Sequence, residues 1–65
     1  MMKVNELKGI MVSRGYTQEM LAKELGISRR TLGSRLKYGV FRSNEIGKLI
    51  EILDIKDPVD IFFTQ

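Results

Sequence analysis

The chain has 65 residues, enough for one small domain with a single hydrophobic core, and it contains neither cysteine nor histidine. This composition excludes disulfides and thiolate metal ligands and removes the usual acid/base group of neutral-pH catalysis, so we expect no enzymatic activity, no metal and no cofactor. Eleven basic and eight acidic residues give a net charge of +3, and no apolar run reaches the roughly 20 residues of a membrane span, so we expect a cytoplasmic protein.

The first helix is predicted from a stripe of apolar residues. Val4, Leu7, Ile10 and Met11 recur at i, i+3 and i+4 spacing, which places them on one helical face. Gly15 follows this stripe and is well placed to end the helix in the left-handed conformation.

A second helix begins after Thr17, whose hydroxyl can accept a hydrogen bond from the first turn. Leu21 and Leu25 share a face of this helix, and Gly26 ends it. Ser28 caps a third helix only two residues later, and that helix runs to about residue 37. The sequence therefore predicts two helices joined through a tight turn of three or four residues.

Two further helices complete the chain. Gly39 ends the third helix, and Ser43 caps a fourth. The apolar positions of this fourth helix are Ile46, Leu49, Ile50 and Leu53. Asp57 and Pro58 suit the cap and the first turn of a short fifth helix. With one proline, no repeat and no low-complexity tract, residues 1–65 are predicted to form a single all-α domain of five helices.

Positive charge is concentrated in residues 29–42. This segment holds five basic residues and none of the eight acids, so it carries +5, while the six basic and eight acidic residues elsewhere sum to −2. The basic cluster consists of Arg29, Arg30, Arg35, Lys37 and Arg42. Such a run is often only a solvated face, but beside two helices joined by a glycine turn it predicts a surface that neutralises phosphates.

The segment 18–37 resembles the helix-turn-helix of the lambda-repressor-like family, the Cro/CI type of phage and bacterial regulators. The matching positions are Thr17-Gln18, Leu21-Ala22, Leu25-Gly26-Ile27-Ser28 and Leu32. In that pattern the small Ala22 lies where the two helices cross, Gly26 makes the turn and Leu32 seats the recognition helix on the core. The resemblance implies a compact five-helix DNA-binding domain, most like a short phage Cro-type protein or an isolated repressor DNA-binding domain.

The resemblance also implies which residues contact DNA. Bases in the major groove would be read from the start of the recognition helix and from one turn further on, by Arg29, Arg30 and Ser34. The sugar-phosphate backbone would be held by residues on either side, which are Gln18, Arg35, Lys37, Tyr38, Arg42, Ser43 and Asn44.

Some of these residues have a second interpretation. Many family members have an apolar residue where this chain has Arg35. In this chain the next residue, Leu36, is apolar instead, so the core face of the third helix runs through Leu32 and Leu36. Arg35 then lies along the flank of the helix, with or without a phosphate contact. Gln18 is either a DNA contact or an ordinary helix-start residue, and Tyr38 either reaches a phosphate or packs against the core.

Three glycines lie inside predicted helices, at positions 9, 33 and 47, where each costs about 0.5 to 1 kcal/mol relative to alanine. Close approach of two helices is the favoured explanation for Gly9 and Gly47. For Gly33, which lies on or near the predicted DNA face, a deeper seat of the helix in the groove is an equally good explanation.

Ile61, Phe62 and Phe63 follow one another near the end of the chain. Three consecutive apolar residues cannot all point the same way from one helical turn, so at least one is predicted to lie outside the core of the monomer. This group is either a subunit contact of a homodimer or the bottom of the core. Residues 43–65 carry two lysines and five acids, a net of −3, so this end should face away from DNA.

Together these features predict a sequence-specific, double-stranded DNA-binding transcription regulator of phage or prophage type, a repressor that occupies its operator and excludes polymerase. We expect a homodimer on an inverted-repeat operator, in the nucleoid of a bacterial or phage-infected cell, without a small-molecule ligand or membrane contact. The alternative is a small helical protein-interaction module, antirepressor-like or antitoxin-like, whose basic face meets an acidic partner.

Overall fold

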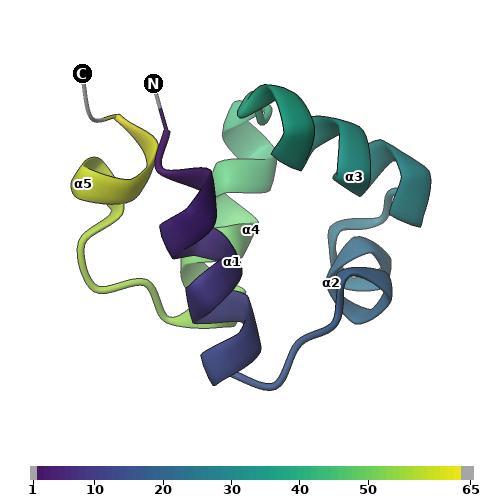
Figure 1. The fold of residues 1–65 in the computed structure, drawn as a ribbon, viewed down its shortest axis with the longest axis horizontal. Helices are drawn as coiled ribbons and strands as arrows, with labels where there is room; N and C mark the ends of the chain where they lie inside the picture. Colours follow the sequence, from purple (N-terminus) through teal and green to yellow (C-terminus); the bar gives the residue numbers. More distant parts are fainter. Residues whose placement is uncertain (1, 64–65) are drawn as a thin grey trace.

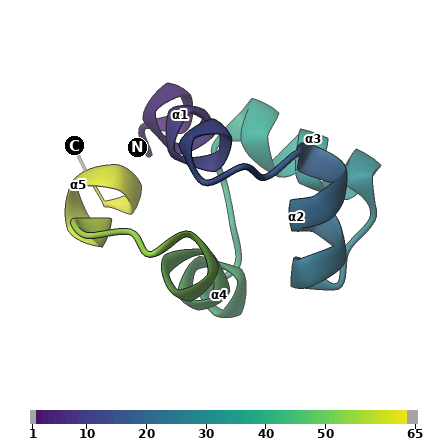
Figure 2. The same cartoon turned by 90° about the horizontal axis from the view of Figure 1, so that it is seen from below.

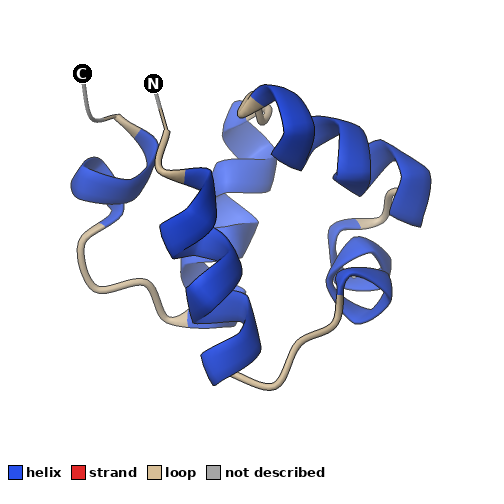
Figure 3. Ribbon diagram, in the orientation of Figure 1, coloured by secondary structure: helices blue, strands red, loops and turns tan. Residues whose placement is uncertain are grey.

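The computed structural model describes residues 2–63, which fold into five helices without a strand. The helices are α1 (Val4–Ser13), α2 (Gln18–Leu25), α3 (Arg29–Tyr38), α4 (Ser43–Leu53) and α5 (Pro58–Phe62). Figures 1 and 3 show their order along the chain and the loops that join them. The predicted all-α fold is confirmed. Within residues 2–63, no helix combines the length and the apolar character needed to cross a membrane.

The helices are arranged with α2 and α3 at one end of the molecule and α5 at the other (Figures 1 and 2). Helices α1 and α4 lie between them. The residues that precede α1 are tied to α5, because the Lys3 N–H donates to the Ile61 carbonyl at 2.8 Å and the Lys3 ammonium lies 3.0 Å from Oδ1 of Asp60. The predicted recognition helix begins at the end of the molecule opposite α5 (Figure 1).

Side-chain hydrogen bonds start α2, α3 and α5 at the residues that the sequence predicts. The hydroxyls of Thr17 and Ser28 and the carboxylate of Asp57 each accept from the N–H three residues later, at 3.1, 3.0 and 3.3 Å. Gly26 and Gly39 end α2 and α3 with φ of 72° and 66°. This left-handed backbone suits glycine because it has no Cβ to clash with the following carbonyl.

The start of α4 differs from the prediction. The expectation that Ser43 caps this helix is wrong, because the cap residue is Arg42, with an extended backbone, and Ser43 is the first helical residue. The carboxylate of Glu45 reaches back and accepts from the Arg42 N–H at 2.9 Å. A glutamate at the third helical position satisfies the N–H of the cap residue in this way in a capping box. Glu45 therefore helps to set where α4 begins.

The core is built mainly from leucines of α1 to α4. The largest fully buried side chains of the described residues are Leu7, Leu21, Leu32, Leu49 and Leu53. Ile61 and Phe62 of α5 belong to the same cluster. Because Leu21 comes from α2 and Leu32 from α3, burial of apolar surface holds both helices of this pair against the rest of the molecule.

Close approach of two helices does not explain Gly9 and Gly47. A Cβ built at either position meets no atom within 4 Å, so this part of the prediction is wrong. Gly33 of α3 likewise has open space where a Cβ would stand. None of the three glycines is therefore needed for helix packing, and only Gly33 lies on the predicted recognition helix.

Candidate nucleic-acid interface

Helices α2 and α3 are joined by a short turn that backbone hydrogen bonds hold to the end of α2. Gly26 leaves α2 in the left-handed conformation, and the Ile27 N–H then donates to the Ala22 carbonyl at 3.0 Å. On α3, Leu32 and Leu36 are buried in the core. These contacts turn one side of α3 inward, and the side chains of Arg30, Ser34 and Lys37 on its opposite side are exposed.

Two of the three residues predicted to contact bases lie on the exposed side of α3, and the third lies at its start. Arg29, Arg30 and Ser34 are all exposed. At 100° per residue, Arg30 and Ser34 lie opposite Leu32 and Leu36, whereas Arg29 lies on the same side as these leucines and is exposed at the first position of the helix. An exposed arginine can donate two hydrogen bonds to O6 and N7 of one guanine, and a serine hydroxyl can serve any base. The geometry is that of a recognition helix whose base contacts remain predictions.

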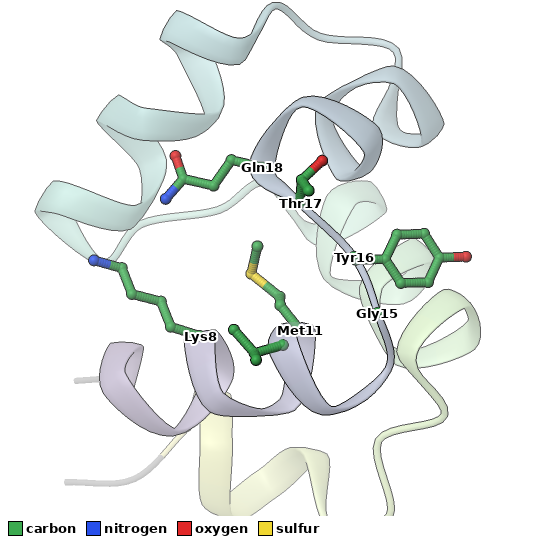
Figure 4. Close-up of a pocket in the computed structure, with 7 residues that line it drawn as sticks. Lys8, Met11, Gly15, Tyr16, Thr17 and Gln18 are labelled. Atoms are coloured by element: carbon green, nitrogen blue, oxygen red, sulfur yellow. The ribbon is translucent and has the colours of Figure 1, made fainter.

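Gln18 lies at the start of α2, on the edge of an open pocket of about 500 Å³ between the end of α1 and the start of α2. The side chains of Lys8 and Gln18 extend to the same side of this pocket, with Met11 between them (Figure 4). Lys8 therefore brings a positive charge close to a predicted phosphate contact. The sequence predicts no DNA contact on α1, because a lone lysine outside any motif gives no signal.

Arg42, Ser43 and Asn44 are exposed where α4 begins. The N–H groups of Ser43 and Asn44 belong to the first helical turn, in which no carbonyl of the same helix can accept from them. Such a helix start carries partial positive charge and favours an anionic group. All three predicted phosphate contacts of this segment are thus accessible and lie at an electropositive helix end.

Lys37 and Tyr38 form a pair at the end of α3. The Lys37 ammonium lies 5.4 Å from the centroid of the Tyr38 ring, which is a cation–π contact. Tyr38 is 69% exposed, so the interpretation that it packs in the core is wrong. Both side chains are therefore accessible at the edge of the basic cluster.

Arg35 differs from the other predicted phosphate contacts because its guanidinium has a partner on α4. Its Nε donates to Oε1 of Glu45 at 2.9 Å and its Nη2 to Oε2 at 3.4 Å. Glu45 is only 4% exposed. Burial alone would raise the pKa of Glu45, but the hydrogen bonds from Arg35 and from the Arg42 N–H bring this pKa below its ordinary value.

The C-terminal apolar residues divide between core and surface. Ile61 and Phe62 are buried, whereas Phe63 is 60% exposed. The prediction that at least one of them lies outside the core is confirmed. The expectation that all three form a subunit contact is wrong for Ile61 and Phe62, because both side chains are buried in the core of the monomer. The predicted dimer contact therefore depends on Phe63.

Comparison with known protein families gives one match over most of the chain. A family model described as helix-turn-helix matches residues 7–58, which begin inside α1 and end at the first residue of α5. The searches of curated proteins and of solved structures returned no match. The matched range contains the whole basic cluster and every residue predicted to contact DNA.

Proposed function

We propose, because this chain belongs to the lambda-repressor-like helix-turn-helix family of DNA-binding transcription regulators, that it is a sequence-specific repressor of phage or prophage type. In this proposal α3 enters the major groove of an operator, and occupancy of that site excludes polymerase. The proposal needs no cofactor and no small-molecule ligand.

The observation that carries the proposal is the two-sided character of α3. Leu32 and Leu36 bury one side of the helix, and Arg30 and Ser34 stand exposed on the other. An arginine that donates to O6 and N7 of one guanine makes the commonest specific contact in the major groove. Arg29, at the start of the helix, would read a neighbouring base.

Phosphate contacts on both sides of α3 would fix its register in the groove. On one side these would be Lys37, Tyr38, Arg42, Ser43 and Asn44. On the other side Gln18 would contact the backbone, and the nearby Lys8 would add a positive charge to the same phosphate region. Contacts of this kind position the protein on DNA but carry no sequence information themselves.

One recognition helix reads too few base pairs to stand out among the competing sites of a genome. We therefore propose that the protein binds as a homodimer to an inverted repeat, with half-sites about 34 to 36 Å apart. Phe63 is the proposed contact, since it is exposed and directly follows α5, the helix at the other end of the molecule from α2.

Selection of bound duplexes from a random pool tests this function. We expect an enriched motif with inverted symmetry. We also expect the affinity to fall with salt. The salt exponent, which is the slope of log affinity against log salt concentration, should be about −4 to −5 per subunit if about five phosphates are neutralised, at about −0.9 per contact. A pool without an enriched motif would contradict the proposal and favour the protein-interaction alternative.

A further inference from the structure

We propose that Arg35 and Glu45 form a positioning pair that fixes the recognition helix relative to the start of α4 and thereby supports operator specificity without touching DNA. This inference rests on the proposed function, and it assigns to Arg35 a role other than a phosphate contact. It also gives a role to Glu45. This residue is buried, although the three residues before it, 42–44, are predicted to bind phosphate.

One carboxylate joins three parts of the molecule. Oε1 of Glu45 accepts from Nε of Arg35, in the last turn of α3, and from the backbone N–H of Arg42, in the loop before α4. Oε2 lies 3.4 Å from Nη2 of Arg35. Glu45 itself belongs to the first turn of α4. The end of α3, the cap residue of α4 and the first turn of α4 therefore share a single anchor.

This anchor lies between the two sets of predicted DNA contacts. Ser34, a predicted base contact, immediately precedes Arg35 in α3. Arg42 and Ser43, predicted phosphate contacts, are the cap residue and the first residue of α4. A change in the spacing between these sets would leave a base contact misplaced while the phosphates are held. A rigid link between the sets is what sequence readout requires.

The geometry disfavours a phosphate as the partner of Arg35. Its Nε and Nη2 already face a carboxylate, so its charge is neutralised within the protein. Drawing the guanidinium toward DNA would leave Glu45 as a buried carboxylate without its cation, and an uncompensated buried charge is strongly unfavourable. Glu45 would also repel a phosphate brought close to it. Arg35 should therefore stay on Glu45 when DNA binds.

A contribution to stability alone does not account well for this pair. Leu32 and Leu36 already seat α3 in the core. A buried ion pair often adds little to stability compared with apolar side chains of the same size, because desolvation offsets the attraction. Arginine and carboxylate do, however, meet in a directional, two-bond geometry. The pair thus supplies orientation that leucine packing does not.

The test compares Arg35→Met with Lys48→Met, a control that removes one positive charge from an exposed position on α4. Affinities are measured for the selected operator and for a scrambled duplex over a range of salt concentrations. We expect Arg35→Met to lower the ratio of the two affinities by about fivefold to 150-fold, the discrimination that one good base contact gives. Its salt exponent should equal that of the wild type, and Lys48→Met should keep the wild-type ratio.

Two results would overturn the inference. If Arg35→Met makes the salt exponent less negative by about 0.9 and weakens binding to both duplexes equally, Arg35 is a phosphate contact. If ratio and exponent both stay at wild-type values in the folded variant, the pair has no part in readout. A wild type without any operator preference would overturn the proposed function, and this inference with it, so the two failures are distinguishable.

A second variant guards against loss of folding. Arg35→Met combined with Glu45→Gln leaves no unpaired buried charge, and the glutamine amide oxygen can still accept from the Arg42 N–H. We expect this double variant to keep the wild-type circular dichroism and to show the lowered affinity ratio. Arg35→Lys, which retains the charge but not the two-bond geometry, should give an intermediate ratio. A wild-type ratio in the folded double variant would contradict the inference.

Discussion

The guanidinium of Arg14 closes the end of α4. Its Nε donates to the Leu53 carbonyl at 2.8 Å, and its Nη2 donates to the Asp54 carbonyl at 3.3 Å. The last carbonyls of a helix have no N–H donor within the helix. The C-terminal end of the helix dipole is also negative, so a cation is favourable there. This basic residue, outside the basic cluster, therefore serves the fold by joining the end of α1 to the end of α4.

Arg14→Ala is expected to lower the free energy of unfolding by about 1 to 2 kcal/mol, because two charge-assisted hydrogen bonds are lost at a site open to water. Urea denaturation measures this change. Lys48→Ala, which also removes one positive charge, is the control and should stay within about 0.5 kcal/mol of the wild type. At a temperature where both are folded, both should bind the operator with the wild-type salt exponent. A salt exponent that becomes less negative for Arg14→Ala alone would show that this guanidinium contacts phosphate.

Gly33→Ala and Gly47→Ala separate helix propensity from DNA contact. Both positions are helical and have open space for a Cβ, so each alanine should raise the free energy of unfolding by about 0.5 to 1 kcal/mol. Gly33 lies on α3, so only Gly33→Ala is expected to change operator affinity. Thermal melts and operator titrations measure the two effects. If both variants bind the operator like the wild type, the absence of a side chain at Gly33 does not matter for groove entry.

Arg30 and Arg42 are predicted to act differently on DNA. Arg30→Ala should cost about 1 to 3 kcal/mol on the best operator and relax the preference at one base pair. Arg42→Ala should weaken all sequences alike and make the salt exponent less negative by about one unit. Titrations with operators mutated one base pair at a time distinguish these patterns. The reverse pattern would mean that α3 is rotated in the groove relative to the proposal.

Local chemistry made most of the fold predictable. The hydroxyls of Thr17 and Ser28 sit immediately before apolar helical patterns, and each accepts a bond from a residue only three positions away. Gly26 and Gly39 needed no tertiary information either, since a left-handed residue after a helix favours glycine. Interactions of short range in sequence can be inferred without knowing how the helices pack.

The start of α4 was predicted wrongly although its signal is local, whereas the partner of Arg35 depends on packing. Ser43 is a good cap residue by type, but Glu45 satisfies the Arg42 N–H instead, and the glutamate three positions after Arg42 was the available signal. The Arg35–Glu45 pair spans ten positions and two helices, so no periodicity reveals it. The sequence left Arg35 either along the flank of α3 or on a phosphate, and it gave no sign of a partner on α4.

The buried carboxylate of Glu45 should make stability depend on acid. Burial pushes its pKa up, but Arg35 and the Arg42 N–H outweigh this effect and bring the pKa below the ordinary value of 4.5. A pKa that is lower in the folded protein stabilises the fold above the unfolded value, and that contribution is lost as the pH falls through the folded value. Glu45→Gln should therefore show a weaker fall in unfolding free energy below about pH 4.5 than the wild type does.

Urea denaturation between pH 7 and pH 3 measures this dependence. Glu51→Gln, which changes an exposed glutamate of the same helix, is the control and should follow the wild-type curve. If Glu45→Gln and the wild type lose stability in parallel over this range, the charge of Glu45 does not contribute to the fold.

Phe62 and Phe63 are neighbours with opposite surroundings. Their rings meet edge to face with centroids 6.5 Å apart, yet Phe62 is in the core and Phe63 is mostly exposed. Phe63→Ala should therefore leave helicity nearly unchanged but reduce the cooperativity of binding to two half-sites, because this exposed aromatic side chain directly after α5 is the proposed dimer contact. Phe62→Ala should instead destabilise the monomer by about 3 to 5 kcal/mol.

Val12→Ala, at another exposed apolar position, on α1, is the control for cooperativity. Circular dichroism, together with titration of operators carrying one or two half-sites, separates these effects. If the selected operator is a single asymmetric half-site, or if Phe63→Ala unfolds the protein while half-site coupling persists in its folded fraction, Phe63 serves the core and another surface must join the subunits.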